Sequence, residues 1–168
     1  MPKIIENLKE RLLAEANRQL TEGGYESVTI RSIAKGCGVG VGTVYNYFPS
    51  KEALIATQLL EDWQSCLETV QTTADLANTP QPVLQCMYAQ LVGFADRHQA
   101  VFHSHAAASG FAGSFSQYHS LLRGQLSEPL LKFCDDSFTA QFVAESLLTW
   151  SMAGKSFEEL YDILKKLF

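Results

Sequence analysis

The stretch VTIRSIAKGCGVGVGTVYNYFPSKEAL, residues 28–54, contains the side chains whose types and spacing suggest a binding chemistry. They are small, aromatic or amide side chains followed by one lysine: Val41, Gly42, Thr43, Tyr45, Asn46, Tyr47 and Lys51. Methyl and amide groups contact base edges in a DNA major groove, whereas hydroxyl and ammonium groups bind phosphates. The stretch therefore predicts contact with double-stranded DNA.

Two short helices joined by a tight turn are needed to position these side chains. Thr29 is suited to cap the first helix, and Gly36 and Gly38 bracket the reversal of the chain. The residues expected to face inward are Ile30, Ile33, Ala34, Val39, Val44 and Phe48. We interpret the stretch as a helix-turn-helix. The alternative is a helical hairpin that only packs in a core, but exposed tyrosines beside Asn46 would gain little from water.

These residues resemble the tetracycline-repressor (TetR) family of bacterial transcription regulators. The matching segments are Gly24-Tyr25, Thr29 to Ala34, Gly38-Val39, Gly42 to Phe48 and Ser50 to Leu54, within a similarity that runs from about Leu8 to Leu59. The resemblance implies DNA contacts near the backbone from Thr29 and Arg31, at bases from Val41, Gly42, Thr43, Tyr45 and Asn46, and at phosphates from Tyr47 and Lys51. The sequence departs from the family at Gly40, where Ser is common, and at Val41, where Lys or a polar residue is common.

Apolar residues recur at helical spacing along the chain, and no sustained alternation typical of strands occurs. We predict an all-α protein of about eight or nine helices, with a capping box from Ser156 to Glu159 at the start of the last helix. Together with the resemblance, this gives a three-helix DNA-binding domain at residues 1–49. Residues 50–168 are then a helical ligand-binding and dimerisation domain.

The charge of the chain is divided unevenly. The net charge is −5, yet the first 51 residues carry seven Lys/Arg against five Glu, a net charge of +2. The remainder carries six Lys/Arg against thirteen Asp/Glu, a net charge of −7. A basic end on an acidic body suits a protein that places only one end on phosphates.

No apolar run approaches the roughly 18 residues that a membrane span requires, and the first residues lack the pattern of a signal peptide. The sequence therefore predicts a cytoplasmic protein. Cys37, Cys66, Cys86 and Cys134 lack the spacing typical of zinc sites or of disulfide-rich domains, so we expect reduced thiols.

Beyond Leu59 the resemblance implies only a helical body that binds a small molecule and forms a homodimer. The residues proposed for an apolar pocket are Met87, Tyr88, Phe94, Phe102, Phe111, Phe115, Tyr118, Leu122 and Trp150, with His103, His119 and Gln125 as polar anchors. The alternative is that these side chains form ordinary core. The sequence does not identify the ligand.

The last two helices present broad apolar faces that suit a second copy of the chain. The proposed interface residues are Ala144, Leu147, Leu148, Ser151, Leu160, Tyr161, Leu164 and Phe168. A dimer supplies two recognition helices to a palindromic operator. The alternative is that both helices only cap the core of the monomer.

Other chemistry is less well supported. The histidines His98, His103, His105 and His119, with Asp96 and Cys134, raise a metal-sensing hypothesis, but side chains two apart on a helix diverge. A triad of Ser109, His119 and Asp96 lacks the strand and turn that expose a nucleophile. We expect no cofactor, no metal and no enzymatic activity. The functional alternative is a helical dimeric interaction or metal-sensing module without sequence-specific DNA binding.

Overall fold

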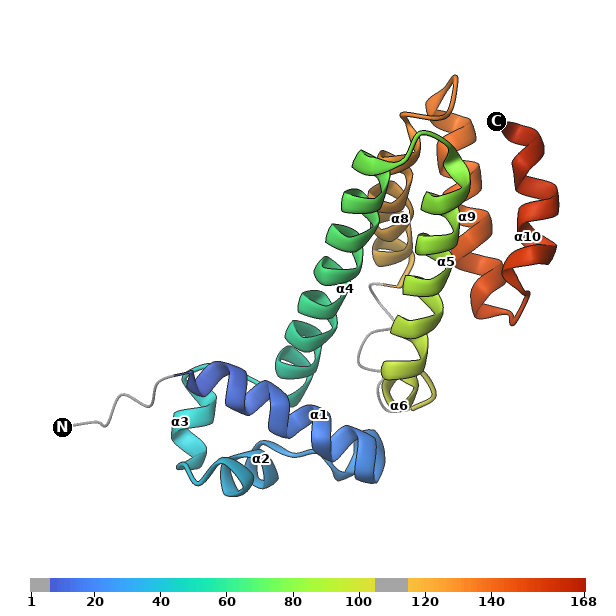
Figure 1. The fold of residues 1–168 in the computed structure, drawn as a ribbon. Helices are drawn as coiled ribbons and strands as arrows, with labels where there is room; N and C mark the ends of the chain where they lie inside the picture. Colours follow the sequence, from blue (N-terminus) through green and yellow to red (C-terminus); the bar gives the residue numbers. More distant parts are fainter. Residues whose placement is uncertain (1–6, 105–114) are drawn as a thin grey trace. The chain divides into compact units, whose positions relative to one another are not determined.

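The computed structural model describes residues 7–104 and 115–168, the first four of the latter by their backbone alone, and this part of the chain contains helices and no strand (Figure 1). The α-helices are α1 Leu8–Ser27, α2 Ile30–Cys37, α3 Val41–Tyr45, α4 Lys51–Leu76, α5 Pro80–Arg97, α6 Gln99–Phe102, α8 Phe115–Ser127, α9 Ser137–Met152 and α10 Phe157–Leu164. Two short 3₁₀ segments, Glu128–Leu130 and Lys165–Leu167, follow α8 and α10. The predicted all-α class is confirmed.

The chain forms two compact units, residues 1–61 with 98–112, and residues 62–97 with 113–168. This division differs from the predicted one after residue 49, because Leu54 and Ile55 at the start of α4 are buried in the core of the first unit. The first unit also includes α6, which contacts α1 and contributes Val101 to the same core.

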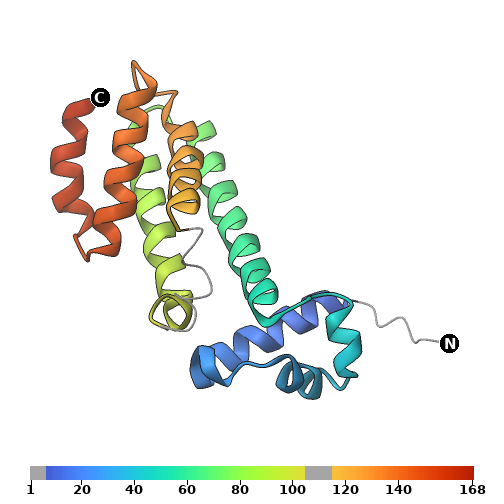
Figure 2. The ribbon, with the colours of Figure 1, turned by 180° about the vertical axis from the view of Figure 1, so that it is seen from behind.

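The first unit is built from α1, α2 and α3, which lie together with the start of α4 (Figure 2). Leu12, Ile33 and Val44 are fully buried at its centre. Gly24 interrupts α1 with a positive φ of 72°, a conformation that glycine adopts without steric cost. This bend returns Tyr25 to the core, where it is 5% exposed.

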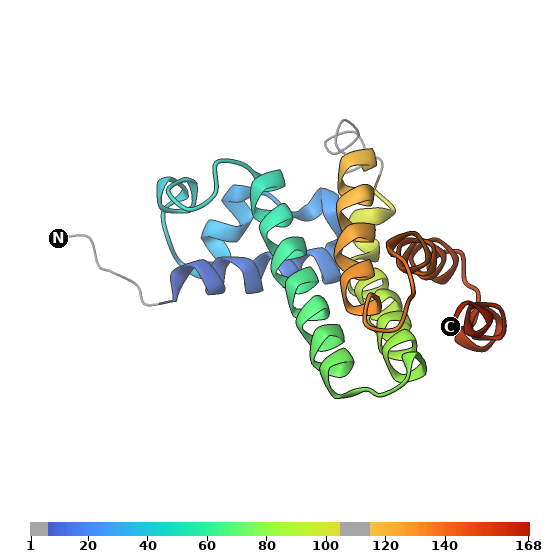
Figure 3. The same cartoon turned by 90° about the horizontal axis from the view of Figure 1, so that it is seen from above.

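The second unit packs α5, α8, α9 and α10 with the later turns of α4, and α9 lies between α8 and α10 (Figure 3). Leu84, Met87 and Leu147 are fully buried in its core. Ser156 and Glu159 form the predicted capping box, in which each side chain accepts a hydrogen bond from the other residue's backbone amide. Backbone donors at the start of α10 are therefore satisfied within the helix itself.

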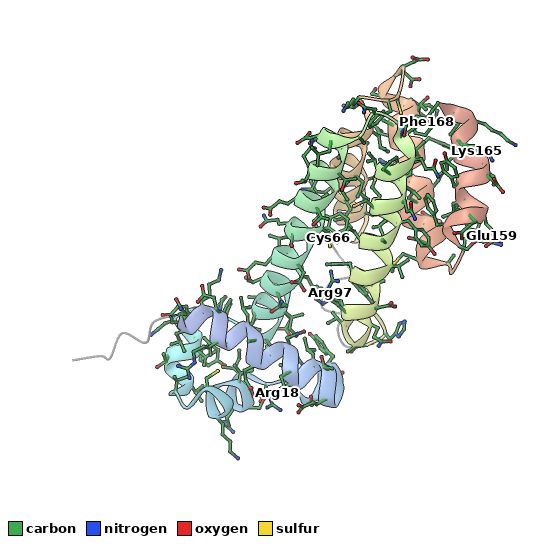
Figure 4. The ribbon with its side chains drawn as sticks, viewed as in Figure 1. Arg18, Cys66, Arg97, Glu159, Lys165 and Phe168 are labelled. Atoms are coloured by element: carbon green, nitrogen blue, oxygen red, sulfur yellow. The ribbon has the colours of Figure 1, made fainter. Side chains whose placement is uncertain are left out.

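The cysteines are free thiols, as the sequence predicts. Cys66 on α4 faces Arg97 on α5 (Figure 4), and Nη2 of the arginine donates to Sγ over 3.5 Å. Burial raises the pKa of the Cys66 thiol, and the guanidinium opposes this shift only in part. Cys66 is thus a protonated core residue near neutral pH.

Candidate nucleic-acid interface

The turn between α2 and α3 is fixed by local hydrogen bonds at both ends of α2. Thr29 Oγ1 accepts from the Ser32 amide over 2.9 Å, and Ser32 Oγ accepts from the Thr29 amide over 3.0 Å, which confirms Thr29 as the N-cap. At the other end Gly38 has φ 68°, and the Val39 amide donates to the Ala34 carbonyl over 2.9 Å. Glycine suits this left-handed position because it has no Cβ.

The recognition segment, residues 41–47, presents its predicted residues outward. Val44 and Phe48 are buried, with 0% and 3% of their surfaces exposed, and they anchor α3 to the core. Val41, Tyr45 and Tyr47 are 37%, 52% and 47% exposed. Gly42 and Asn46 are also exposed, and Thr43 is half-buried. Large rings held in solvent by buried neighbours are typical of a contact surface.

The first turns of α2 and α4 border one hollow of about 590 Å³. Its lining consists of Glu26, Val28, Thr29, Ile30, Arg31, Val41, Tyr45, Pro49, Ser50, Lys51 and Glu52. Ser50 Oγ accepts from the Ala53 amide over 3.1 Å and so caps α4. Two helix N-termini, a guanidinium and an ammonium at one hollow favour an anion. The carboxylates of Glu26 and Glu52 line the same hollow and partly offset this positive charge.

Lys51 is held within the first unit rather than extended into solvent. Its Nζ donates to the Tyr25 carbonyl over 2.5 Å and lies 3.7 Å from the centroid of the Tyr25 ring. Burial lowers the pKa of this ammonium. Tyr25 Oη in turn donates to Glu52 Oε1 over 3.5 Å, and burial together with Glu52 raises the pKa of the phenol. The sequence contains no signal of this cluster, because Tyr25 has the pattern of a core residue.

A polar network also joins α1 to α2. Ser32 Oγ donates to Gln19 Oε1 over 2.6 Å, and Gln19 Nε2 donates to Glu15 Oε1 over 2.7 Å. Arg18 binds the same carboxylate through Nη2 over 2.7 Å. These bonds lower the pKa of Glu15 to about 2. The network connects the N-cap of α2 to α1.

The described structure does not gather the proposed pocket residues at one place. Phe102 and His103 belong to the first unit and are exposed. Met87 is fully buried, Tyr88 Oη donates to the Lys155 carbonyl over 2.9 Å, and Trp150 is 50% exposed. Phe111 and the side chains of Phe115 and Tyr118 lie outside the described residues.

Three of the proposed pocket residues do lie near one another in the second unit. Phe94 and Leu122 pack against its core, and Gln125 Oε1 accepts from Trp63 Nε1 over 2.8 Å. The Trp63 and Phe94 rings meet edge to face with centroids 5.4 Å apart. Sequence reasoning missed Trp63, which has the pattern of one more member of an apolar stripe. His119 Nε2 lies 3.7 Å from Glu145 Oε1.

The proposed dimer residues require a correction. Six of them are buried in the core of their own unit: Ala144, Leu147, Leu148, Ser151, Leu160 and Leu164. A side chain already removed from water has no surface left to bury against a partner. Tyr161 is half-buried, with its ring centroid 5.4 Å from that of Phe157, and Phe168 is 38% exposed at the carboxyl end (Figure 4).

A different set of large apolar side chains on α9, α10 and the 3₁₀ segment after α10 faces solvent: Phe138, Phe142, Trp150, Met152, Ile163 and Leu167. Phe138 and Phe142 stand one turn apart with ring centroids separated by 6.4 Å. The sequence does contain a signal of this exposed pair, because two phenylalanines four residues apart lie on the same face of a helix.

Within residues 7–104 and 115–168, no three His, Cys, Asp or Glu side chains converge in a way that could hold a metal ion. His98 is buried beside Phe102, with ring centroids 6.5 Å apart, and His105 and Ser109 lie outside this part. In the same part of the chain, no helix combines the length and the apolar character that crossing a membrane requires.

Comparison with known proteins identifies the amino-terminal segment. Residues 12–57 match the family described as bacterial regulatory proteins, tetR family. The regulator UidR of Escherichia coli K12 is 37% identical over 59 residues, which cover 35% of this chain and 30% of UidR. The repressor KstR of Mycolicibacterium smegmatis is 32% identical over 83 residues, 49% of this chain and 41% of KstR. The chain thus matches less than half the length of either relative.

The fold likeness extends further along the chain. The crystal structure of the regulator FadR from Bacillus subtilis, in complex with stearoyl-CoA, superposes with a TM-score of 0.56 at 19% identity. The superposition covers 94% of this chain and 96% of FadR. The likeness therefore extends to the helical body beyond the matched segment.

Proposed function

Because this chain carries a DNA-binding domain of the TetR family, we propose that it is a homodimeric transcription regulator, a repressor that a small-molecule ligand releases from a palindromic operator. The observation that carries the proposal is the surface of the recognition segment, residues 41–47, which exposes Val41, Tyr45 and Tyr47 while Val44 and Phe48 fix it to the core. The hollow at the start of α2 and α4 supplies a phosphate site beside that surface.

The contacts are divided between bases and phosphates. Val41, Gly42, Thr43, Tyr45 and Asn46 face base edges in the major groove. The backbone contacts come from Thr29, Arg31, Tyr47 and Lys51. Phosphate contacts set register and orientation, whereas base contacts provide discrimination between sequences.

The second copy of the chain docks on the exposed apolar residues of α9 and the carboxyl end, centred on Phe138 and Phe142. Phe138 is 75% exposed and its ring lies 6.4 Å from that of Phe142, and neighbouring exposed apolar side chains of this kind are characteristic of interfaces. A two-fold dimer places two recognition helices about 34–36 Å apart, on successive major grooves of a palindrome.

Release by a ligand requires coupling between the second unit and the DNA-binding unit. The chain itself connects them, because α5 of the second unit is followed directly by α6, whose Val101 is part of the core that also holds α1 and α3. A ligand in the second unit, near Met87, Phe94, Leu122 and Gln125, would act by favouring a state that does not fit DNA. Two relatives support a repressor that a ligand releases. KstR is a transcriptional repressor, and FadR is a regulator whose crystal structure is a complex with stearoyl-CoA.

Thermodynamic linkage sets the condition for this mechanism. A ligand shifts the equilibrium only if it binds the DNA-free state more tightly, and operator DNA must then weaken ligand binding by the same factor. Equal ligand affinity with and without operator would contradict release by this route.

The test of the proposed function is selection of duplexes from a random pool, followed by binding at several salt concentrations. We expect one palindromic sequence to be enriched and to bind about 10³-fold or more tightly than random duplex at physiological salt. The slope of log K against log salt should be steep for both. Enrichment of no sequence would favour the interaction or metal-sensing module instead.

A further inference from the structure

The recognition segment lacks charged side chains. Between Lys35 and Lys51 the sequence contains no Asp, Glu, Lys, Arg or His. Guanine is most often read by Arg or Lys, which donate to its O6 and N7 together. Since α3 lies in the middle of this stretch, it offers no side chain of either type to a guanine.

The direction in which each residue points follows from the buried side chain. Successive residues of an α-helix are about 100° apart, so Gly42 and Asn46 lie opposite the buried Val44. Val41 and Thr43 flank Gly42 on either side. Apart from its chain neighbours and the backbone of its own helix, a Cβ added to Gly42 would have no protein heavy atom within 4 Å, so the fold leaves this space open. The outward surface of α3 is therefore the backbone at Gly42, with the methyl groups of Val41 and Thr43 on either side and the exposed Tyr45 ring beside it.

The apolar group that a major groove offers to such a surface is the 5-methyl of thymine. The amide of Asn46 matches the N6 and N7 positions of adenine, which donate and accept one hydrogen bond each. Both features occur in A·T pairs, and neither requires a charged side chain.

We propose that α3 reads A·T base pairs, with Val41 and Thr43 contacting thymine methyl groups and Asn46 an adenine edge. This specificity rests on the proposed function, because it concerns the bases opposite the same helix. Any guanines in the operator are contacted by elements of the protein other than α3.

The test uses the intact protein and the duplex enriched by selection. Each thymine is replaced in turn by deoxyuridine, which removes the methyl group and keeps the hydrogen-bonding edge. We expect a loss of about fourfold per methyl at one or two thymines of each half-site, as burial of one methyl group implies. Val41→Ala or Thr43→Ser should abolish the loss at the thymine that each residue contacts.

The control variant is Leu60→Ala, which truncates an exposed apolar residue of α4 outside the recognition segment and should keep the full sensitivity to deoxyuridine. If a specific operator is bound but no thymine is sensitive, the A·T specificity is wrong and the proposed function stands. The A·T specificity is also wrong if guanines opposite α3 respond to 7-deazaguanine. If no operator is enriched, both proposals fall.

Discussion

Single residues at the interface serve the fold and the proposed contacts at the same time. Thr29 caps α2 through Ser32, and Lys51 binds the carbonyl and ring of Tyr25 at the start of α4. Both side chains are therefore held by contacts within the first unit where they line the hollow. Ordering before association lowers the entropy that binding must overcome.

Replacement of Lys51 by Met should weaken binding to operator and to random duplex alike. The change removes one phosphate neutralisation per protomer, so the log-log salt slope should fall by about 0.9 for each Lys51 lost. Titrations at four or more salt concentrations measure this slope. Lys166→Met, at an exposed lysine of the second unit, is the control. A weaker affinity with an unchanged slope would instead assign Lys51 a purely structural role beside Tyr25.

Gly42→Ala should separate stability from DNA binding. The free protein has open space at this position, and alanine in place of a helical glycine should raise the free energy of unfolding by about 0.5–1 kcal/mol. Operator affinity should fall, because the added methyl stands on the surface that approaches the bases.

The matched control for this pair of measurements is Gly124→Ala in α8, where an added Cβ also meets open space. Urea unfolding should show a similar gain in stability for this variant, with operator affinity unchanged. Should Gly42→Ala bind the operator as tightly as the unaltered chain, α3 would not lie close to the bases.

At the scale of the helices, apolar periodicity predicted the class of the fold, and capping residues and glycines predicted most of the turns. Both kinds of signal are local in the sequence. Thr29, Ser156 and Glu159 are capping residues that act within one turn of chain. The dimer face could not be predicted in this way. Leu147 and Phe142 are both apolar residues of α9, and only packing against α5, α8 and α10 decides that the first is buried and the second exposed.

The contact between α1 and α2 should depend on pH through Glu15. Its pKa is lowered to about 2, mainly by the hydrogen bonds from Arg18 and Gln19. A carboxylate with a depressed pKa stabilises the fold fully above its unfolded value near 4.5, and this contribution disappears as pH falls toward about 2. Glu15→Gln should therefore flatten the loss of stability between those pH values in urea unfolding. If the free energy of unfolding of this variant falls with decreasing pH as steeply as that of the unaltered chain, Glu15 does not contribute to the pH dependence.

For the molecule as a whole, the proposed function requires two copies of the chain. The acidic remainder of the sequence, with a net charge of −7, favours contact with DNA only through the basic first 51 residues. A single recognition helix covers one half-site, so sequence-specific binding at physiological salt depends on the dimer.

Phe138→Glu combined with Phe142→Glu should convert the dimer to a folded monomer at micromolar concentration, because two charges would have to be buried at the interface. Sedimentation gives the mass, and circular dichroism checks that the helices persist. Leu76→Glu is the control, since Leu76 is 80% exposed but lies at the end of α4. A dimer that survives the double substitution would place the interface elsewhere on the chain.

The proposed function depends above all on discrimination between DNA sequences by α3, which paired binding measurements on operator and random duplex can test. Thr43→Ala and Tyr45→Ala should each cost roughly 1–3 kcal/mol on the operator and little on random duplex, because base contacts carry the discrimination. Tyr47→Phe should weaken both, without a change in salt slope, since it removes a neutral hydroxyl from a phosphate. If all three variants stay folded dimers and bind the operator as tightly as the unaltered chain, the helix-turn-helix is only scaffold and α3 does not read DNA.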